Sequence, residues 1–109
     1  MKFGLTEKEE LSIKRVFDEF PEIQEVIIFG SRAIGNFKPA SDIDLAIKGI
    51  SIDLGLLGKI KAQLEENTPV PYFFDLVNLE TISHKELKEH IREHGRTFYT
   101  TRSTVLNSP

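Results

Sequence analysis

Three aspartates have the residue type and spacing that favour catalysis. Asp42 and Asp44 are two positions apart in a segment that begins with alternating polar and apolar residues, and Asp75 stands in a later segment. Side chains two residues apart on a strand leave the same face, so the first two carboxylates are expected close together. Like charges at close range repel, so that one carboxylate takes up a proton or a cation neutralises both. Oxygen ligands suit a hard divalent cation, most naturally Mg²⁺.

Asp75 extends this site if its strand lies beside the strand of Asp44. It stands within the apolar run Phe73–Val77, where an unpaired carboxylate is costly. Three carboxylates together are able to hold two metal ions and to activate a hydroxyl group. The alternatives are a polar strand edge for Asp42 and Asp44, and for Asp75 an acid paired with Arg32 or a lysine.

Gly30 and Ser31 follow a short β-branched segment and are suited to hold an anion. Gly30 has no Cβ, so a phosphate can approach the backbone, and the Ser31 hydroxyl and the amides that open a helical turn are donors. The sequence lacks the Gly-Lys-Ser/Thr of a P-loop and the glycine spacing of a dinucleotide site. The alternative is a tight strand-to-helix turn with a serine cap. Arg32 and, more weakly, Lys38 are basic candidates for a phosphate contact. For Arg32 the alternatives are a contact with a metal-site acid and a surface ion pair.

Alternating helix and strand patterns surround these residues. A capping box of Thr6 and Glu9 predicts the start of the first helix, and a second one of Ser83 and Glu86 predicts the start of the last. Hydrophobic periodicity predicts a small sheet flanked by helices, of the α/β (α+β) class, with Phe98 and Tyr99 packed back on the core. The expected elements are helices over 6–20, 52–66 and 83–94, strands over 25–29, 42–48 and 72–79, and one helical turn after Ser31.

Length, charge and composition restrict the function classes. We expect one domain over 1–109, with 101–109 as a flexible tail. The chain has no cysteine, a formal net charge of −3 and no apolar run long enough for a membrane span. Its first residues lack the basic-then-apolar pattern expected of a secretory signal. These features favour a cytoplasmic protein without a strong nucleic-acid footprint. The three histidines are expected on a solvated helix face rather than in a metal site. They are His84, His90 and His94.

The sequence resembles the signature of the minimal nucleotidyltransferases, which are small members of the DNA polymerase β-like superfamily. The resemblance rests on Gly-Ser-Arg-Ala-Ile-Gly at 30–35, Ser-Asp-Ile-Asp-Leu-Ala-Ile at 41–47 and the later strand acid Asp75. It implies a short mixed sheet flanked by helices and the transfer of a nucleoside monophosphate, here AMP from ATP, with release of pyrophosphate. Members often carry arginine in place of Ile34, so Arg32 and Lys38 are considered as substitutes for that charge.

The resemblance also implies a role for each candidate residue. Asp75 would both ligate a metal ion and help to deprotonate the acceptor hydroxyl. The implied nucleotide-binding residues are Gly30, Ser31 and Arg32, and the implied ligands of two Mg²⁺ ions are Asp42, Asp44 and Asp75.

A protein partner is implied in the same way. Stand-alone members are often encoded beside a small helical HEPN protein as a toxin–antitoxin pair, in which the nucleotidyltransferase is the antitoxin and adenylylates the toxin. The small size also suggests a homodimer or a complex with that partner. Two alternatives remain: a binding module that masks a toxic partner without catalysis, and nucleotidyl transfer to a small molecule such as an aminoglycoside.

Overall fold

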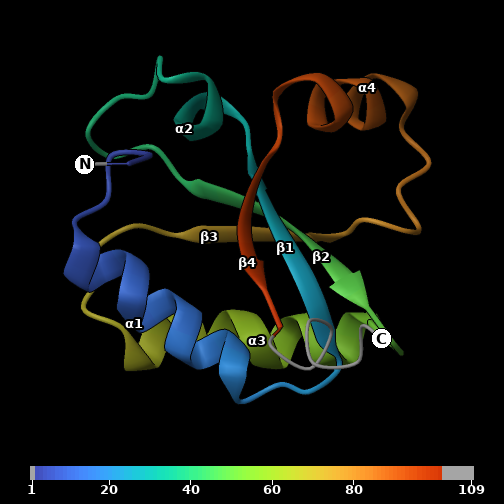
Figure 1. The fold of residues 1–109 in the computed structure, drawn as a ribbon, viewed down its shortest axis with the longest axis horizontal. Helices are drawn as coiled ribbons and strands as arrows, with labels where there is room; N and C mark the ends of the chain where they lie inside the picture. The colour runs from blue at the N-terminus through green and yellow to red at the C-terminus, as the bar shows by residue number, and fades with distance from the viewer. Residues whose placement is uncertain (1, 102–109) are drawn as a thin grey trace, which may run out of the picture.

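The computed structural model describes residues 2–101 and contains one four-stranded sheet with helices around it (Figure 1). The strand order is β3-β2-β1-β4; β1 runs antiparallel to β2 and β4, whereas β3 runs parallel to β2. This mixed α+β architecture confirms the predicted fold class. The elements are α1 (Glu7–Asp18), β1 (Ile23–Phe29), α2 (Ser31–Ile34), β2 (Ile43–Gly49), α3 (Leu54–Asn67), β3 (Phe74–Asn78), α4 (Lys85–His94) and β4 (Arg96–Thr100).

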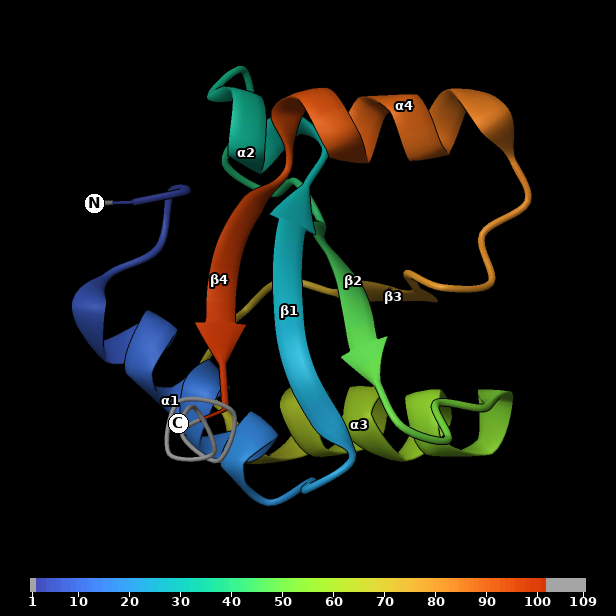
Figure 2. The same ribbon diagram turned by 45° about the vertical axis from the view of Figure 1, so that its right-hand side comes forward.

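Alternate side chains of the sheet enter two apolar clusters, because successive residues of a strand face opposite sides. Val26 and Ile28 belong to the larger cluster, together with residues of α1 and α3. Phe29 and Ala46 pack with Ile91 of α4 in the smaller cluster on the other face. Figure 2 shows α2 and α4 at the end of the sheet where β1 ends. Among residues 2–101, no helix has the length and apolar character needed to cross a membrane.

The two ends predicted from capping boxes differ in outcome. At α1 the box is confirmed: Glu9 N donates to Thr6 Oγ1 at 3.0 Å, and Thr6 N donates to Glu9 Oε1 at 2.9 Å. At α4 the prediction is wrong, because the helix begins one residue later than Ser83 implied. His84 is the N-cap, with extended backbone, and its Nδ1 accepts a hydrogen bond from Leu87 N at 3.2 Å.

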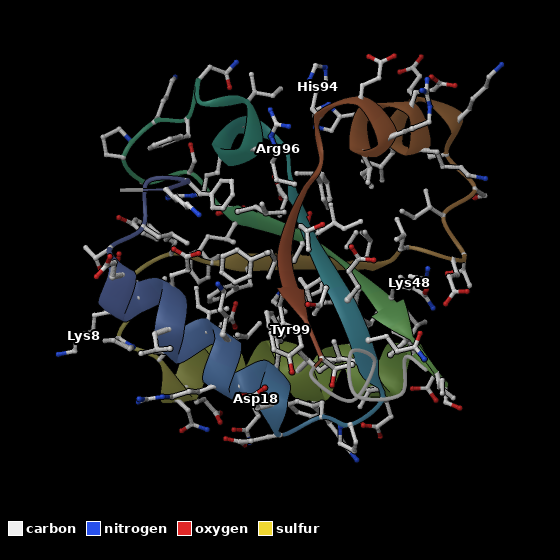
Figure 3. The ribbon with its side chains drawn as sticks, viewed as in Figure 1. Lys8, Asp18, Lys48, His94, Arg96 and Tyr99 are labelled. Carbon is white, nitrogen blue, oxygen red and sulfur yellow. The ribbon has the colours of Figure 1, made fainter. Side chains whose placement is uncertain are left out.

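The strand β4 was not predicted from the sequence, which indicated only that Phe98 and Tyr99 return to the core. Phe98 is buried, and Tyr99 donates a hydrogen bond of 2.7 Å to Asp18 Oδ1 of α1 (Figure 3). Burial and this hydrogen bond raise the pKa of Tyr99 to about 12. The flexible tail expected over 101–109 lies, apart from Thr101, outside the described residues.

Candidate active site

Strand register brings two of the predicted acids side by side. In the parallel pair of β2 and β3, Asp44 is the direct partner of Asp75, and in the antiparallel pair Asp44 is opposite Phe29. Paired residues project from the same face, so both carboxylates lie on the face that α4 partly covers. Asp42 lies just before β2, two residues from Asp44. All three predicted acids therefore stand where β2 and β3 begin and β1 ends.

Burial and neighbouring charges shift the pKa of the Asp44 carboxyl. Partial burial raises its pKa to about 6, and the negative charges of Asp75 and Asp42 add to the rise. The positive charge of Arg32 lowers the pKa of Asp44 but does not cancel these effects. A cation placed among the carboxylates would relieve the same repulsion.

The acids have the right chemistry for a metal ion without being assembled around one. Within residues 2–101, no three Asp, Glu, His or Cys side chains are grouped closely enough to hold a metal ion. All the oxygen donors are carboxylates, which suit Mg²⁺. Asp42 and Asp75 are exposed, so their side chains have room to change rotamer and close on a cation. The donor set therefore fits the predicted metal.

Gly30 directly follows β1 and lies against the carboxylate of Asp44. Its backbone has φ +76° and ψ −158°, a conformation that only glycine adopts readily. A Cβ at this position would overlap Asp44 Oδ2, so the absence of a side chain lets the loop lie against that carboxylate. Ser31 follows directly and begins α2, the single helical turn predicted after Ser31, which ends at Ile34. The predicted loop residues thus lie beside the predicted acids.

Arg32 has contacts that differ from those expected. Its side chain is 2% exposed, and its Nε and Nη2 donate to Ser41 O at 3.0 and 2.7 Å. Its Nη1 donates to Phe3 O at 2.9 Å, and the guanidinium lies 4.2 Å from the centre of the Tyr72 ring. The structure therefore places Arg32 beneath the loop as a structural support. It neither forms a surface ion pair nor directs these donors toward a phosphate.

His90 lies near the site, whereas the sequence predicted it on a solvated helix face. Its Nε2 accepts a hydrogen bond of 2.9 Å from Gly30 N. Its position near the sheet could have been predicted from helical spacing, because His90 and His94 lie on the same helix face as Leu87 and Ile91. Ile91 is buried, which directs this face toward the sheet.

A separate pocket of about 370 Å³ lies between α4 and the sheet. Ile27, Ile91 and Thr97 are among its lining residues, whereas none of the three aspartates is. The acids lie outside this pocket, and two of them, Asp42 and Asp75, are exposed at the surface.

Comparisons with known proteins identify the family and the fold. A family model described as "Polymerase beta, Nucleotidyltransferase" matches residues 12–104. A toxin–antitoxin crystal structure with AMP-PNP is 24% identical, over 91% of this chain and 77% of that chain, with a TM-score of 0.69. The crystal structure of the MntA-HepT toxin–antitoxin is 22% identical, over 91% and 76% of the two chains, with a TM-score of 0.65. At these identities the two structures show a shared fold. The search of curated proteins returned no match to this sequence.

Proposed function

The chain belongs to the polymerase β nucleotidyltransferase family, and from that premise we propose that it transfers AMP from ATP to a hydroxyl group of a partner protein. The observation that carries the proposal is the register of Asp44 with Asp75, next to Gly30 and with Asp42 just before the strand of Asp44. Burial and, after it, the negative charges of Asp75 and Asp42 raise the pKa of Asp44, and a bound cation would offset both effects.

In this proposal all three aspartates bind metal, and one of them also accepts a proton. Asp42, Asp44 and Asp75 would hold Mg²⁺, most simply two ions, which would neutralise charge on the triphosphate and the acceptor oxygen. Asp75 is exposed, and in this proposal its carboxylate takes the proton of the acceptor hydroxyl. The acceptor oxygen then bonds to the α-phosphorus, while the bond from that phosphorus to the pyrophosphate oxygen breaks.

The loop after β1 would hold the triphosphate. Gly30 brings the backbone against Asp44, and the hydroxyl of Ser31 is the next donor along the chain. Since the amide of Gly30 already donates to His90, Ser31 is the better candidate for direct contact with phosphate. Arg32 would support this loop from below through its bonds to Ser41 O.

A protein acceptor is supported by the exposure of Asp42 and Asp75 at the surface. Phe73 is 73% exposed, and its carbonyl accepts from Ile43 N at 2.9 Å, so an uncovered aromatic ring stands next to the start of β2. Two structurally similar proteins are toxin–antitoxin complexes, one with AMP-PNP and one named MntA-HepT. We therefore favour a small helical HEPN-type toxin as the partner and a cytoplasmic antitoxin role for this chain, rather than a homodimer.

Label transfer tests the proposal directly. The purified chain is incubated with ATP labelled at the α-phosphate, with Mg²⁺, and with the protein encoded beside it. We expect label on the partner with the wild type and a loss of several orders of magnitude with the Asp42→Asn/Asp44→Asn double variant. Glu66→Gln, on the exposed side of α3, is a matched control that should transfer normally.

Three outcomes separate the alternatives. Absence of transfer by the wild type, or equal transfer by the double variant, would contradict catalysis by these acids. If the double variant transfers no AMP but still fully protects cells from the toxic partner, the chain would be a module that masks this partner by binding alone. Label on an aminoglycoside instead of the protein would indicate a small-molecule acceptor.

A further inference from the structure

We propose that His90 is a positioning residue of the active site, which holds the Gly30 peptide in place against Asp44. This inference rests on the proposed function for its effect on catalysis. The contact itself is a 2.9 Å hydrogen bond from Gly30 N to His90 Nε2, between residues 60 positions apart in the chain. Because Nε2 accepts, the imidazole carries no proton on that nitrogen in this arrangement.

The imidazole of His90 is held in place by the packing of α4. The neighbouring residue Ile91 is 5% exposed and belongs to the same apolar cluster as Phe29 and Ala46. The His90 ring also meets the Phe29 ring edge to face, with ring centres 6.1 Å apart and an interplanar angle of 74°. The acceptor nitrogen is therefore fixed relative to the end of β1, since Phe29 is the last residue of that strand.

The Gly30 peptide is anchored on both sides. Its N–H donates to His90, and its carbonyl accepts from Ala33 N at 3.1 Å and Ile34 N at 3.2 Å. Glycine has wide conformational freedom, so an unanchored Gly30 would sample other backbone angles. A change there would alter the surface against which Asp44 Oδ2 rests. His90 thus affects the position of the Asp44 carboxylate through Gly30. Residues that do not contact a metal ion but orient its ligands act in a similar way.

Two substitutions of His90 separate the hydrogen bond from the bulk of the side chain. His90→Leu removes the acceptor and keeps an apolar side chain, whereas His90→Gln offers an amide oxygen in place of Nε2. We expect His90→Leu to lower kcat for AMP transfer roughly 10- to 100-fold with a smaller change in KM for ATP, as for other residues that support a metal site. His90→Gln should recover most of that loss.

The matched control is His94→Leu. His94 lies one turn further along α4 and is exposed (Figure 3). Its ring centre is 5.2 Å from that of His90. The hydrogen bond from Gly30 is made to His90. Transfer by His94→Leu should therefore stay within a factor of about two of the wild type, which is the scatter of ordinary surface substitutions.

A readout independent of catalysis keeps this inference separate from the proposed function. Mn²⁺ binding to the purified chain, followed by electron paramagnetic resonance, should be about 10-fold weaker in His90→Leu than in the wild type and restored in His90→Gln. Circular dichroism confirms that each variant is folded.

If the wild type transfers no AMP but this pattern of Mn²⁺ affinities is found, the proposed function fails while the positioning role stands. Equal Mn²⁺ affinity in folded His90→Leu and wild type would overturn the inference, as would a loss in His94→Leu as large as in His90→Leu.

Discussion

Asp44 is the residue that links the electrostatics of the site to the stability of the protein. Its pKa rises from 3.8 to about 6, first through burial and then through Asp75 and Asp42. A carboxyl with a raised pKa binds its proton more tightly in the folded than in the unfolded chain. The free energy of unfolding therefore falls as the pH rises from about 4 to about 6, and the full penalty is present at neutral pH.

This sign predicts that Asp44→Asn stabilises the metal-free protein at pH 8. The expected gain in free energy of unfolding is on the order of 1 kcal/mol, because solvent screens a half-exposed carboxylate. At pH 4 the two proteins should differ little. Urea denaturation in EDTA at both pH values measures the effect, and adding Mg²⁺ should stabilise the wild type more than the variant. A variant less stable than the wild type at pH 8 in EDTA would refute this account.

Gly30 has a second structural reason to be glycine. The sequence indicated a backbone that a phosphate can approach, and that role remains a proposal. The structure shows in addition a positive φ and a carboxylate of Asp44 in the place that a Cβ would occupy. The residue type was predictable from the motif, whereas this contact depends on the pairing of Asp44 with Phe29, next to Gly30.

Among the elements, α4 links the loop to the sheet. Its buried Ile91 packs against Phe29 and Ala46, and His90 on the same helix accepts the Gly30 amide. The helix was predicted with its C-terminal end near His94, which the structure confirms. Its N-terminus was misplaced by one residue, because the Ser83 and Glu86 spacing is consistent with a capping box whether or not the backbone of Ser83 adopts the cap conformation.

The corrected cap makes a direct prediction at this helix. His84→Ala should destabilise α4 by about 0.5–1 kcal/mol, since it removes the acceptor for Leu87 N, whereas Ser83→Ala should change little. Native-state hydrogen exchange of the α4 amides measures the difference. A larger effect from Ser83→Ala than from His84→Ala would show that the predicted capping box forms in solution.

At the scale of the whole molecule, Arg32 joins parts of the chain that are distant in sequence. Its guanidinium binds the carbonyls of Phe3 and Ser41 and stacks on the Tyr72 ring. The N-terminal segment, the loop before Asp42 and the approach to β3 therefore meet at one buried cation. Its charge also lowers the pKa of Asp44, so this support stabilises the ionised form of the acid.

Loss of this support should destabilise the molecule as a whole. Arg32→Met keeps much of the volume but removes several hydrogen bonds from a charged donor, each of which contributes about 1.5–3 kcal/mol, so a loss of about 3 kcal/mol or more is expected. Arg32→Lys should recover only part, because a lysine ammonium lacks the planar fork that reaches Ser41 O twice. Thermal unfolding compares the three proteins; a change below about 0.5 kcal/mol in Arg32→Met would contradict the structural role.

The amino-acid sequence by itself determined the local features of this protein. Hydrophobic periodicity and turn residues predicted the three main helices, the turn at Ser31 and three of the four strands found within residues 2–101. These patterns depend on neighbours within a few residues. The motif spacing likewise predicted the candidate site residues, which are Gly30, Ser31, Arg32, Asp42, Asp44 and Asp75.

Tertiary structure decided what depends on contacts between distant segments. The strand β4 pairs with β1 across about 70 residues, and the hydrogen bond from Gly30 to His90 spans 60 positions. The burial of Arg32 also requires the N-terminal segment and Tyr72 to be in place. A sequence pattern records which face of an element is apolar, but which partner that face meets is set only when the whole chain packs.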